Sequence, residues 1–428
     1  MRPVEEQIDQ LAESIRAWRK PMTTPTNAGS THGPLEGLRV LEMGQLLAGP
    51  FASVLLAWFG AEVIKIEPPG VGDPLRTWRA LHKGTALWWY ILGRNKKCIT
   101  VNLRAPKGQE IVRQLLPKMD VVLENFKPGT MERWGLGYED LKKINPRIIM
   151  ARISGWGQTG PYSPKPGFAS VAEGVGGLRY VTGYPDRPPV RPNLSLGDSL
   201  AGLHAALGIL MAVYYRDVRG AGVGQMIDVA IYEAVYNMME GIVPEYDKCG
   251  IVREREGTRL TGIVPTGTYP CKDGTYIIIG GNSDSIFKRM MCAIGRPEMA
   301  NDPRFEHNND RVQYVDEIDE AIAAWTSQHP YDEVLRVLEG ADVPVGPIYS
   351  VAEMLRDPHF QARGLFEDVV LEDGDTVKLP TLIPKMSETP GGTKWIGPPL
   401  GAHNREILGG MLGFSEEQLK DLEAEGVI

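Results

Sequence analysis

The strongest constraint on the fold is an alternation of short apolar runs with helical segments between Leu38 and Ser154. The apolar runs are residues 38–43, 62–67, 98–103, 120–125 and 147–154. The segments of helical pattern between them are residues 50–60, 107–119 and 138–145. Strands separated by helices of this length favour a parallel sheet with right-handed crossovers. The sequence therefore predicts an α/β fold whose larger domain contains a Rossmann-like sheet.

The rest of the chain divides by composition. Residues 1–34 are interpreted as an N-terminal extension, with a short helix at 5–19 and a linker from Pro21 to Pro34 that is rich in Pro, Thr, Gly and Ser. We predict a large domain at 35–248, a smaller α+β domain at 249–346, and a segment at 347–428 that returns to the large domain. Residues 198–217 predict one long helix that is apolar on nearly every face, so we expect it to be buried.

Composition excludes several classes of protein. The net charge of −8 argues against a surface for nucleic acid or anionic membrane, because both need an excess of basic residues. Residues 1–20 carry both signs of charge and no apolar core, unlike a secretory signal. The uncharged stretch from Met43 to Ala61 is interrupted early by Gly44, Gly49 and Pro50. We therefore expect a cytoplasmic protein.

No metal or nucleotide motif is present in the sequence. It lacks a Walker loop, an H-E-x-x-H pair and a G-x-S-x-G elbow. The seven histidines are dispersed, and the four cysteines are scattered without C-x-x-C spacing. We expect no metal site, and we interpret the cysteines as small buried hydrophobic residues.

Asp198 stands where a polar loop gives way to the long apolar helix. One interpretation is structural, because Asp is a preferred N-cap whose carboxylate accepts free amide hydrogens of the first turn. The other is chemical. A carboxylate at a helix N-terminus tends to stay ionised, and an ionised carboxylate can attack a thioester. The residues alone leave both interpretations open.

Six segments occur in an order that resembles the family III coenzyme A-transferases, the CaiB–BaiF group. They are residues 35–76, 93–110, 121–149, 155–168, 195–210 and 222–235, and among them are LRVLEMGQLLAGP, ENFKPGTMERWG and SLGDSLAGL. The resemblance begins near Leu35 and continues to the C-terminus. It implies a Rossmann-like large domain with a smaller domain, in a dimer of interlocked, ring-like chains.

The resemblance also implies roles for individual residues. The catalytic aspartate of the family falls on Asp198, whose carboxylate would form first a mixed anhydride and then an aspartyl-CoA thioester. Coenzyme A and acyl-CoA would be substrates, with no prosthetic group. The implied CoA-binding residues are Leu47, Ala48, Arg104, Asn125, Phe126, Lys127, Arg133 and Phe168. Some relatives have Arg where this chain has Pro68, which leaves the contacts to the nucleotide end less defined.

Two alternatives share the resemblance. The α-methylacyl-CoA racemases use a His and an Asp, and the Asp belongs to a G-H-D-like triplet. This chain has Gly167, Phe168 and Ala169 there, and neither Phe nor Ala takes a proton. The second alternative is a non-catalytic subunit that supports an active relative, and the presence of Asp198 argues against it.

Within the family, the phrases FKPGTMERWGL and REREG resemble enzymes that use succinyl-CoA and act on dicarboxylates such as malate or benzylsuccinate. Several of those contain two related subunits, so the partner is expected to be a second copy or a related chain. Arg179 and Arg191 lie near Asp198 in the sequence. Each is a candidate for binding a second carboxylate or for a loop salt bridge.

Overall fold

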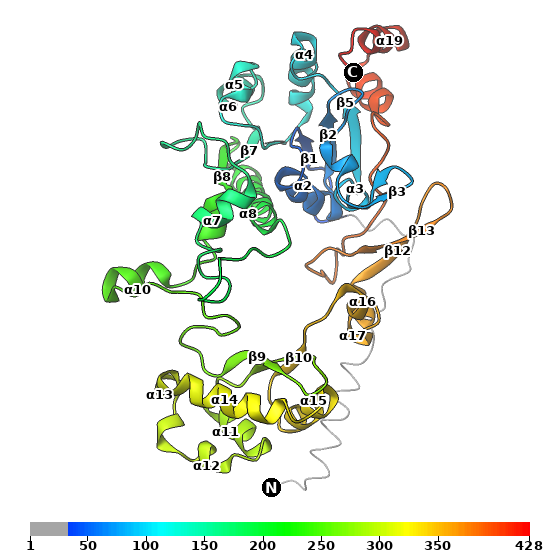
Figure 1. The fold of residues 1–428 in the computed structure, drawn as a ribbon. Coiled ribbons are helices and arrows are strands. Elements are labelled where there is room, and N and C mark those ends of the chain that lie inside the picture. The colour runs from blue at the N-terminus through cyan, green and yellow to red at the C-terminus, as the bar shows by residue number, and fades with distance from the viewer. Residues whose placement is uncertain (1–32) are drawn as a thin grey trace. The chain divides into compact units, whose positions relative to one another are not determined.

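The computed structural model describes residues 33–428 (Figure 1). The helix expected at 5–19 and nearly all of the expected linker lie outside the described residues. The chain forms two compact units. The first comprises the described residues up to Met43, with Ser53–Val122 and Ala352–Ile428, and the second comprises Gly44–Ala52 and Leu123–Val351.

Six strands form one sheet in the order β5-β2-β1-β6-β7-β8. They are β1 (Arg39–Glu42), β2 (Glu62–Glu67), β5 (Lys96–Thr100), β6 (Val121–Glu124), β7 (Ile149–Ser154) and β8 (Met226–Ala230). The pairs β1–β2, β2–β5 and β7–β8 are parallel. The α/β fold with a parallel sheet is therefore confirmed. Most residues of β1, β2, β6 and β7 are buried, as continuous apolar runs predict for a sheet covered on both faces.

In the first unit, the end of the chain binds the edge strand β5. The amide of Thr100 donates to Asn404 Oδ1 at 2.8 Å, and Trp395 Nε1 donates to the Lys96 carbonyl at 2.9 Å. Other elements of this unit are β3 (Leu81–His82), β4 (Thr85–Ala86), α3 (Leu87–Leu92), α4 (Pro106–Leu115), the hairpin β12 (Phe366–Val370) and β13 (Thr376–Pro380), α17 (Pro358–Ala362) and α19 (Glu416–Ala424).

A fully buried ionic network lies among β1, β2 and β5. Lys65 Nζ and Lys96 Nζ each lie 2.8 Å from an oxygen of the Glu42 carboxylate, and Lys65 also pairs with Asp73 at 2.8 Å. Ser53 donates a further hydrogen bond to Glu42 at 2.6 Å. Burial opposes ionisation of Glu42, but the two ammonium groups outweigh it and lower its pKa to about 2.

The second unit has two parts, and the second of them has a hydrophobic core of its own. The first holds α5 (Thr130–Arg133), α6 (Tyr138–Ile144), α7 (Ala169–Val175), α8 (Leu196–Val213), α9 (Ile231–Tyr236) and α10 (Ile242–Cys249). The second has an antiparallel sheet in the order β11-β10-β9, made of Val345–Pro347, Tyr276–Gly280 and Thr266–Pro270. Helices α11 (Asp284–Ala293), α14 (Val315–Thr326) and α15 (Tyr331–Gly340) lie beside it (Figure 1) and share a core with Phe287 and Phe305.

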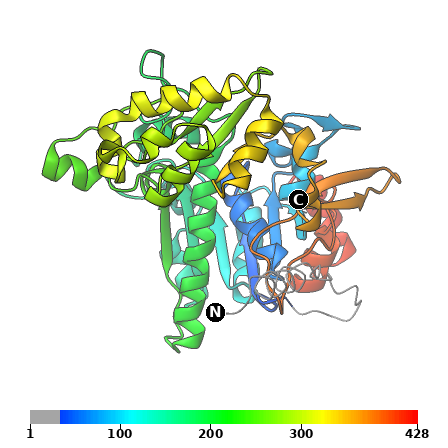
Figure 2. The same ribbon diagram turned by 90° about the horizontal axis from the view of Figure 1, so that it is seen from below.

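Helix α8, the long green helix of Figure 2, has two different faces. Its buried face consists mainly of small residues and packs against α7, α9, β7 and β8. On the other face Leu203, Leu207 and Met211 are at least half exposed within this chain. The expectation that the helix is buried all round is therefore wrong for the single chain. Apolar composition does not tell whether the surface that covers a helix face belongs to the same chain.

Helix α8 with its last turn, Leu196–Val218, is also long and apolar enough to cross a membrane. This is weak evidence, because core helices of soluble proteins pass the same test. Its small-residue face packs against protein elements of the second unit.

Candidate active site

Asp198 is the third residue of α8 rather than its N-cap. The helix begins at Leu196, so the N-cap position falls on Ser195, whose side chain makes no capping hydrogen bond. The N-cap interpretation of Asp198 is therefore wrong. The residue still lies in the first turn, where the free amide groups and the helix dipole favour negative charge.

A second carboxylate lies beside Asp198. Glu173 on α7 is completely buried and accepts a hydrogen bond at 3.2 Å from the backbone amide of Gly197, the residue before Asp198. Arg191 donates two hydrogen bonds to the same carboxylate, from Nε to Oε2 at 2.7 Å and from Nη2 to Oε1 at 3.1 Å. Arg179 approaches it to 3.7 Å. The structure thus brings Arg179 and Arg191 together around Glu173.

These neighbours set the ionisation of Asp198. Burial and repulsion by Glu173 raise its pKa to about 6, and attraction by Arg191 offsets only part of that. The expectation that the helix terminus keeps this carboxylate ionised therefore holds near neutral pH but not at pH 5. Sequence reasoning missed Glu173. Its only signal was a lone acidic residue in the small-residue segment ASVAEGV.

The loop before α2 (Ala48–Trp58) approaches α8 one turn after Asp198. A Cβ atom on Gly202 would lie 2.7 Å from the carbonyl oxygen of Ala48, so the two backbones are in direct contact there. Leu47 and Ala48 are both buried. The side chain of Asn125 fixes the same loop by accepting from the Gln45 amide and donating to the Gln45 carbonyl, each at 2.8 Å.

The other predicted CoA-binding residues of this unit are more exposed. Lys127 lies just before α5 and Arg133 is the last residue of α5, and Arg133 donates to the Thr130 hydroxyl at 2.8 Å. Phe126 packs edge-to-face on Trp134, with ring centroids 5.2 Å apart. Phe168, just before α7, is 70% exposed. Arg104 is exposed in the first unit, between β5 and α4. A CoA-binding role for each of these residues stays a prediction.

Glu124 fixes the start of the segment that carries Lys127 and Arg133. It is buried at the end of β6, accepts from the Phe126 amide at 2.6 Å and pairs with Arg152 at 2.7 Å. Burial outweighs the guanidinium and raises the pKa of Glu124 to about 7. Arg152 also reaches Glu132 on α5 at 2.6 Å, so one guanidinium ties the strand end to the helix that carries Arg133.

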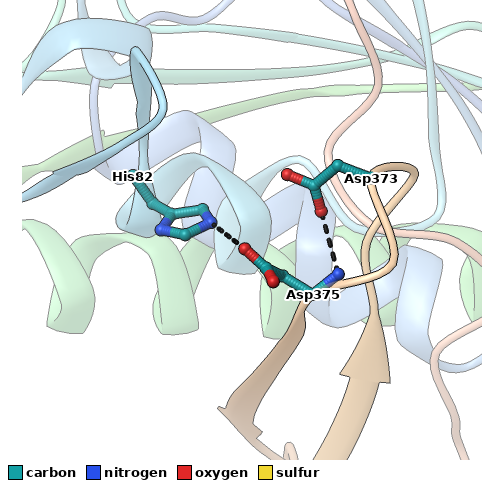
Figure 3. A group of neighbouring side chains, drawn as sticks. All are labelled: His82, Asp373 and Asp375. Carbon is teal, nitrogen blue, oxygen red and sulfur yellow. Dashed lines mark hydrogen bonds and ion pairs between the residues drawn. The ribbon is translucent and has the colours of Figure 1, made fainter.

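A cluster in the first unit offers three atoms of the kind that bind metals. His82, Asp373 and Asp375 lie together where the β12–β13 turn meets β3 (Figure 3). The ammonium of Lys83 lies 2.6 Å from an oxygen of each aspartate. Because the Lys83 ammonium already pairs with both carboxylates, we interpret the cluster as a set of ion pairs that joins the hairpin to β3.

The position used for proton transfer in the racemases holds no acid or base. Ala169 is the buried first residue of α7, and Phe168 before it makes no capping hydrogen bond. The structure brings together in this region the carboxylate of Asp198, the neighbouring carboxylate of Glu173, and the guanidinium groups of Arg179 and Arg191 around Glu173.

The model of CoA-transferase family III matches residues 35–404. The chain belongs to this family. It is 50% identical over 396 residues to a succinyl-CoA–D-citramalate CoA-transferase of Chloroflexus aurantiacus, covering 92% of this chain and 98% of the relative. The α subunit of the succinyl-CoA–L-malate CoA-transferase of the same organism is 41% identical over the full length of both chains.

More distant relatives fit the same family. The human succinyl-CoA:glutarate CoA-transferase is 33% identical, covering 92% of this chain and 90% of the relative. Among solved structures, a CaiB/BaiF family protein from Brucella suis superposes with a TM-score of 0.77 at 34% identity, over 89% of this chain and all of the other. The resemblance inferred from the six ordered segments is confirmed, and the protein is a CoA-transferase that uses CoA thioesters as substrates.

Proposed function

We propose that this CoA-transferase moves CoA from succinyl-CoA to a dicarboxylic acid of the malate or citramalate type, through covalent intermediates on Asp198. The relatives named above take succinyl-CoA as donor and citramalate, malate or glutarate as acceptor, which supports the substrate class. The position of Asp198 supports the mechanism most. It is the acidic residue in the first turn of α8, and its pKa of about 6 leaves it ionised for the larger part at neutral pH.

The reaction proceeds in four balanced transfers. The Asp198 carboxylate attacks the succinyl carbonyl, forming a mixed anhydride and expelling CoA thiolate. The thiolate attacks the aspartyl carbonyl, which gives an aspartyl-CoA thioester and frees succinate. The acceptor carboxylate then attacks this thioester, forming a second anhydride and releasing the thiolate again. Finally the thiolate attacks the acceptor acyl carbonyl, which yields the new acyl-CoA and restores the carboxylate.

The CoA-binding residues form the second part of the proposal. Lys127 and Arg133 are exposed cations at the two ends of the segment 127–133, suited to charge-assisted bonds with phosphate oxygens. Phe126, Phe168 and Arg104 remain candidates for further contacts to CoA. Leu47 and Ala48 would line the pocket near the thioester, since their loop abuts α8 beside Asp198. Asn125 would act by fixing that loop.

The proposed assembly is a dimer of interlocked chains. Along each chain, the proposed small domain at 249–346 lies between the large domain and the C-terminal segment that returns to it. The exposed apolar face of α8 supports the dimer, because such a surface is costly to leave in water. The partner is a second copy or a related subunit. The Chloroflexus L-malate enzyme has both an α and a β subunit that are similar to this chain. We place the enzyme in the cytoplasm.

Trapping the intermediate tests the mechanism. The purified protein is incubated with succinyl-CoA and hydroxylamine and then digested, and the masses of its peptides are measured by mass spectrometry. A hydroxamate is expected on the peptide that contains Asp198, and neither label nor turnover is expected in Asp198→Asn. A panel of dicarboxylates then identifies the acceptor. Transfer without any label on Asp198, or transfer retained in Asp198→Asn, would overturn the proposed mechanism.

A further inference from the structure

Two arginines share a single buried carboxylate next to the nucleophile. Arg191 binds Glu173 with two hydrogen bonds of 2.7 and 3.1 Å, and Arg179 lies 3.7 Å from it. A single carboxylate carries one negative charge, so Glu173 neutralises only one of the two guanidinium groups. Arg191 is near enough to Asp198 to favour its charged form.

The charges of this group balance only while Asp198 is ionised. Arg179 and Arg191 contribute two positive charges, and Glu173 and Asp198 contribute two negative charges. When the Asp198 carboxylate becomes an anhydride or a thioester it loses its charge, and one positive charge is left over. An unpaired charge in a partly buried site is unfavourable, so the acylated enzyme attracts an anion at this place.

Both arginines have donors left for such an anion. Arg191 uses Nε and Nη2 on Glu173, and no hydrogen bond of Nη1 is present among the described residues. The Arg179 side chain makes no hydrogen bond within residues 33–428, and because its Nε is buried, Nη1 and Nη2 are the donors that it can offer. The side chains are 36% and 32% exposed, whereas Glu173 is completely covered. A substrate can therefore reach the guanidinium groups but not the carboxylate that holds them.

We propose that Arg191 and Arg179 bind the distal carboxylate of the dicarboxylic acyl group that is attached to Asp198 or about to attack its thioester. This rests on the proposed function and names the residues that select its substrates. A dicarboxylic acyl group supplies the anion that restores the balance of charge, and the planar guanidinium fork suits a carboxylate. A monocarboxylic acyl group leaves the excess positive charge in place. Glu173 is a positioning residue, because it holds Arg191 and the Gly197 amide next to the nucleophile.

The test compares two acceptors of equal length, glutarate and valerate, with the same donor at pH 8, where Asp198 is ionised in all variants. The quantity measured is the ratio of kcat/KM for glutarate to that for valerate. Arg191→Gln and Arg179→Gln are each expected to lower this ratio about tenfold or more, as loss of a charge-assisted contact predicts. The matched control is Arg187→Gln, an exposed arginine of the same loop that stacks over Tyr184, and its ratio is expected to equal that of the wild type.

The outcomes separate this proposal from the proposed function. A wild-type enzyme that transfers CoA from succinyl-CoA to no dicarboxylate of the panel contradicts the proposed function. A wild type that prefers valerate, or glutamine variants that keep the wild-type ratio, overturns the role of the arginines alone. If both glutamine variants lose all turnover, Arg191→Lys decides the question, because lysine keeps the charge and loses the paired donors. A lowered ratio in that variant supports the proposal, and an unchanged ratio overturns it.

Discussion

Gly202 of α8 and Ala48 at the start of α2 are packed backbone against backbone. A Cβ atom at Gly202 would come within 2.7 Å of the Ala48 carbonyl oxygen and 3.0 Å of the Phe51 ring. This contact holds the loop with Leu47 against α8, one turn from the proposed nucleophile Asp198. A glycine in mid-helix lowers helix propensity, so its presence here is explained by the close approach.

Gly202→Val is therefore expected to lower the free energy of unfolding by about 1–3 kcal/mol through overpacking, and to lower activity by displacing the loop. Urea denaturation and kcat/KM measure the two effects. The matched control is Gly174→Ala on α7, where an added Cβ meets no atom within 4 Å, and a neutral or slightly stabilising effect is expected there. Wild-type stability of Gly202→Val would show that the two backbones can separate freely.

The sheet was predictable from the sequence because its strands are short continuous apolar runs, and such runs report burial on both faces. Asp198 could be placed because the motif SLGDS carries it. Its exact place in the helix could not be predicted, since Leu196 and Gly197 already adopt helical geometry and move the N-cap upstream to Ser195. The first residue of a helix depends on the local backbone geometry, and the residue type favours this geometry without determining it.

The group of charges around Asp198 was not predictable in full. Glu173, Arg179 and Arg191 are separated by loops whose course depends on tertiary packing, and the sequence indicated only that the arginines lie near Asp198. Glu173 looked like any helical surface residue, yet it is completely buried. The exposed face of α8 was missed for a related reason. An apolar sequence predicts that a helix face is buried, but it does not tell whether the same chain or another chain buries it.

Loss of the buried ionic network is expected to be costly. Glu42→Gln leaves Lys65 and Lys96 with one partner fewer in a fully buried place, so we expect a loss of about 3–5 kcal/mol in the free energy of unfolding. The pKa of Glu42 is lowered on folding, so its contribution is complete above pH 4.5 and is lost as the pH falls towards 2. Urea titrations of wild type and variant from pH 7 to pH 3 measure both effects. Glu62→Gln on the adjacent strand, whose carboxylate is partly exposed, serves as control and is expected to cost at most about 1 kcal/mol.

Lys127→Ala is expected to weaken CoA binding by about 1–2 kcal/mol, or roughly 5- to 30-fold in Kd, because a charge-assisted contact to phosphate is lost. The chemical step is expected to change little, since this ammonium is not part of the group around Asp198. Isothermal titration with CoA and kcat at saturating succinyl-CoA separate the two effects. Lys118→Ala, another exposed lysine, is the control. An unchanged Kd for CoA in Lys127→Ala would remove Lys127 from the binding site.

A charge on the exposed face of α8 is expected to break the assembly. Leu207 is half exposed in this chain, and Leu207→Glu would place a carboxylate in the proposed interface, where its desolvation opposes association. Light scattering coupled to size-exclusion chromatography should give a dimer for the wild type and a smaller or aggregated species for the variant. Val370→Glu on the hairpin β12–β13 adds the same charge at an exposed site and should leave the mass unchanged. A wild-type protein of monomer mass, or a dimer that tolerates Leu207→Glu, contradicts the interface.

The pH profile reports most directly on the nucleophile. In the proposed mechanism only ionised Asp198 attacks the thioester, so kcat/KM is expected to fall about tenfold per unit of pH below a midpoint near its pKa of about 6. Glu173 raises that pKa and Arg191 lowers it. Glu173→Gln should therefore move the acid limb to lower pH, and Arg191→Gln should move it to higher pH, whereas Arg187→Gln leaves it in place. A purely structural role of Glu173 would lower activity equally at every pH. Identical midpoints in wild type, Glu173→Gln and Arg191→Gln would mean that a group other than Asp198 controls the reaction.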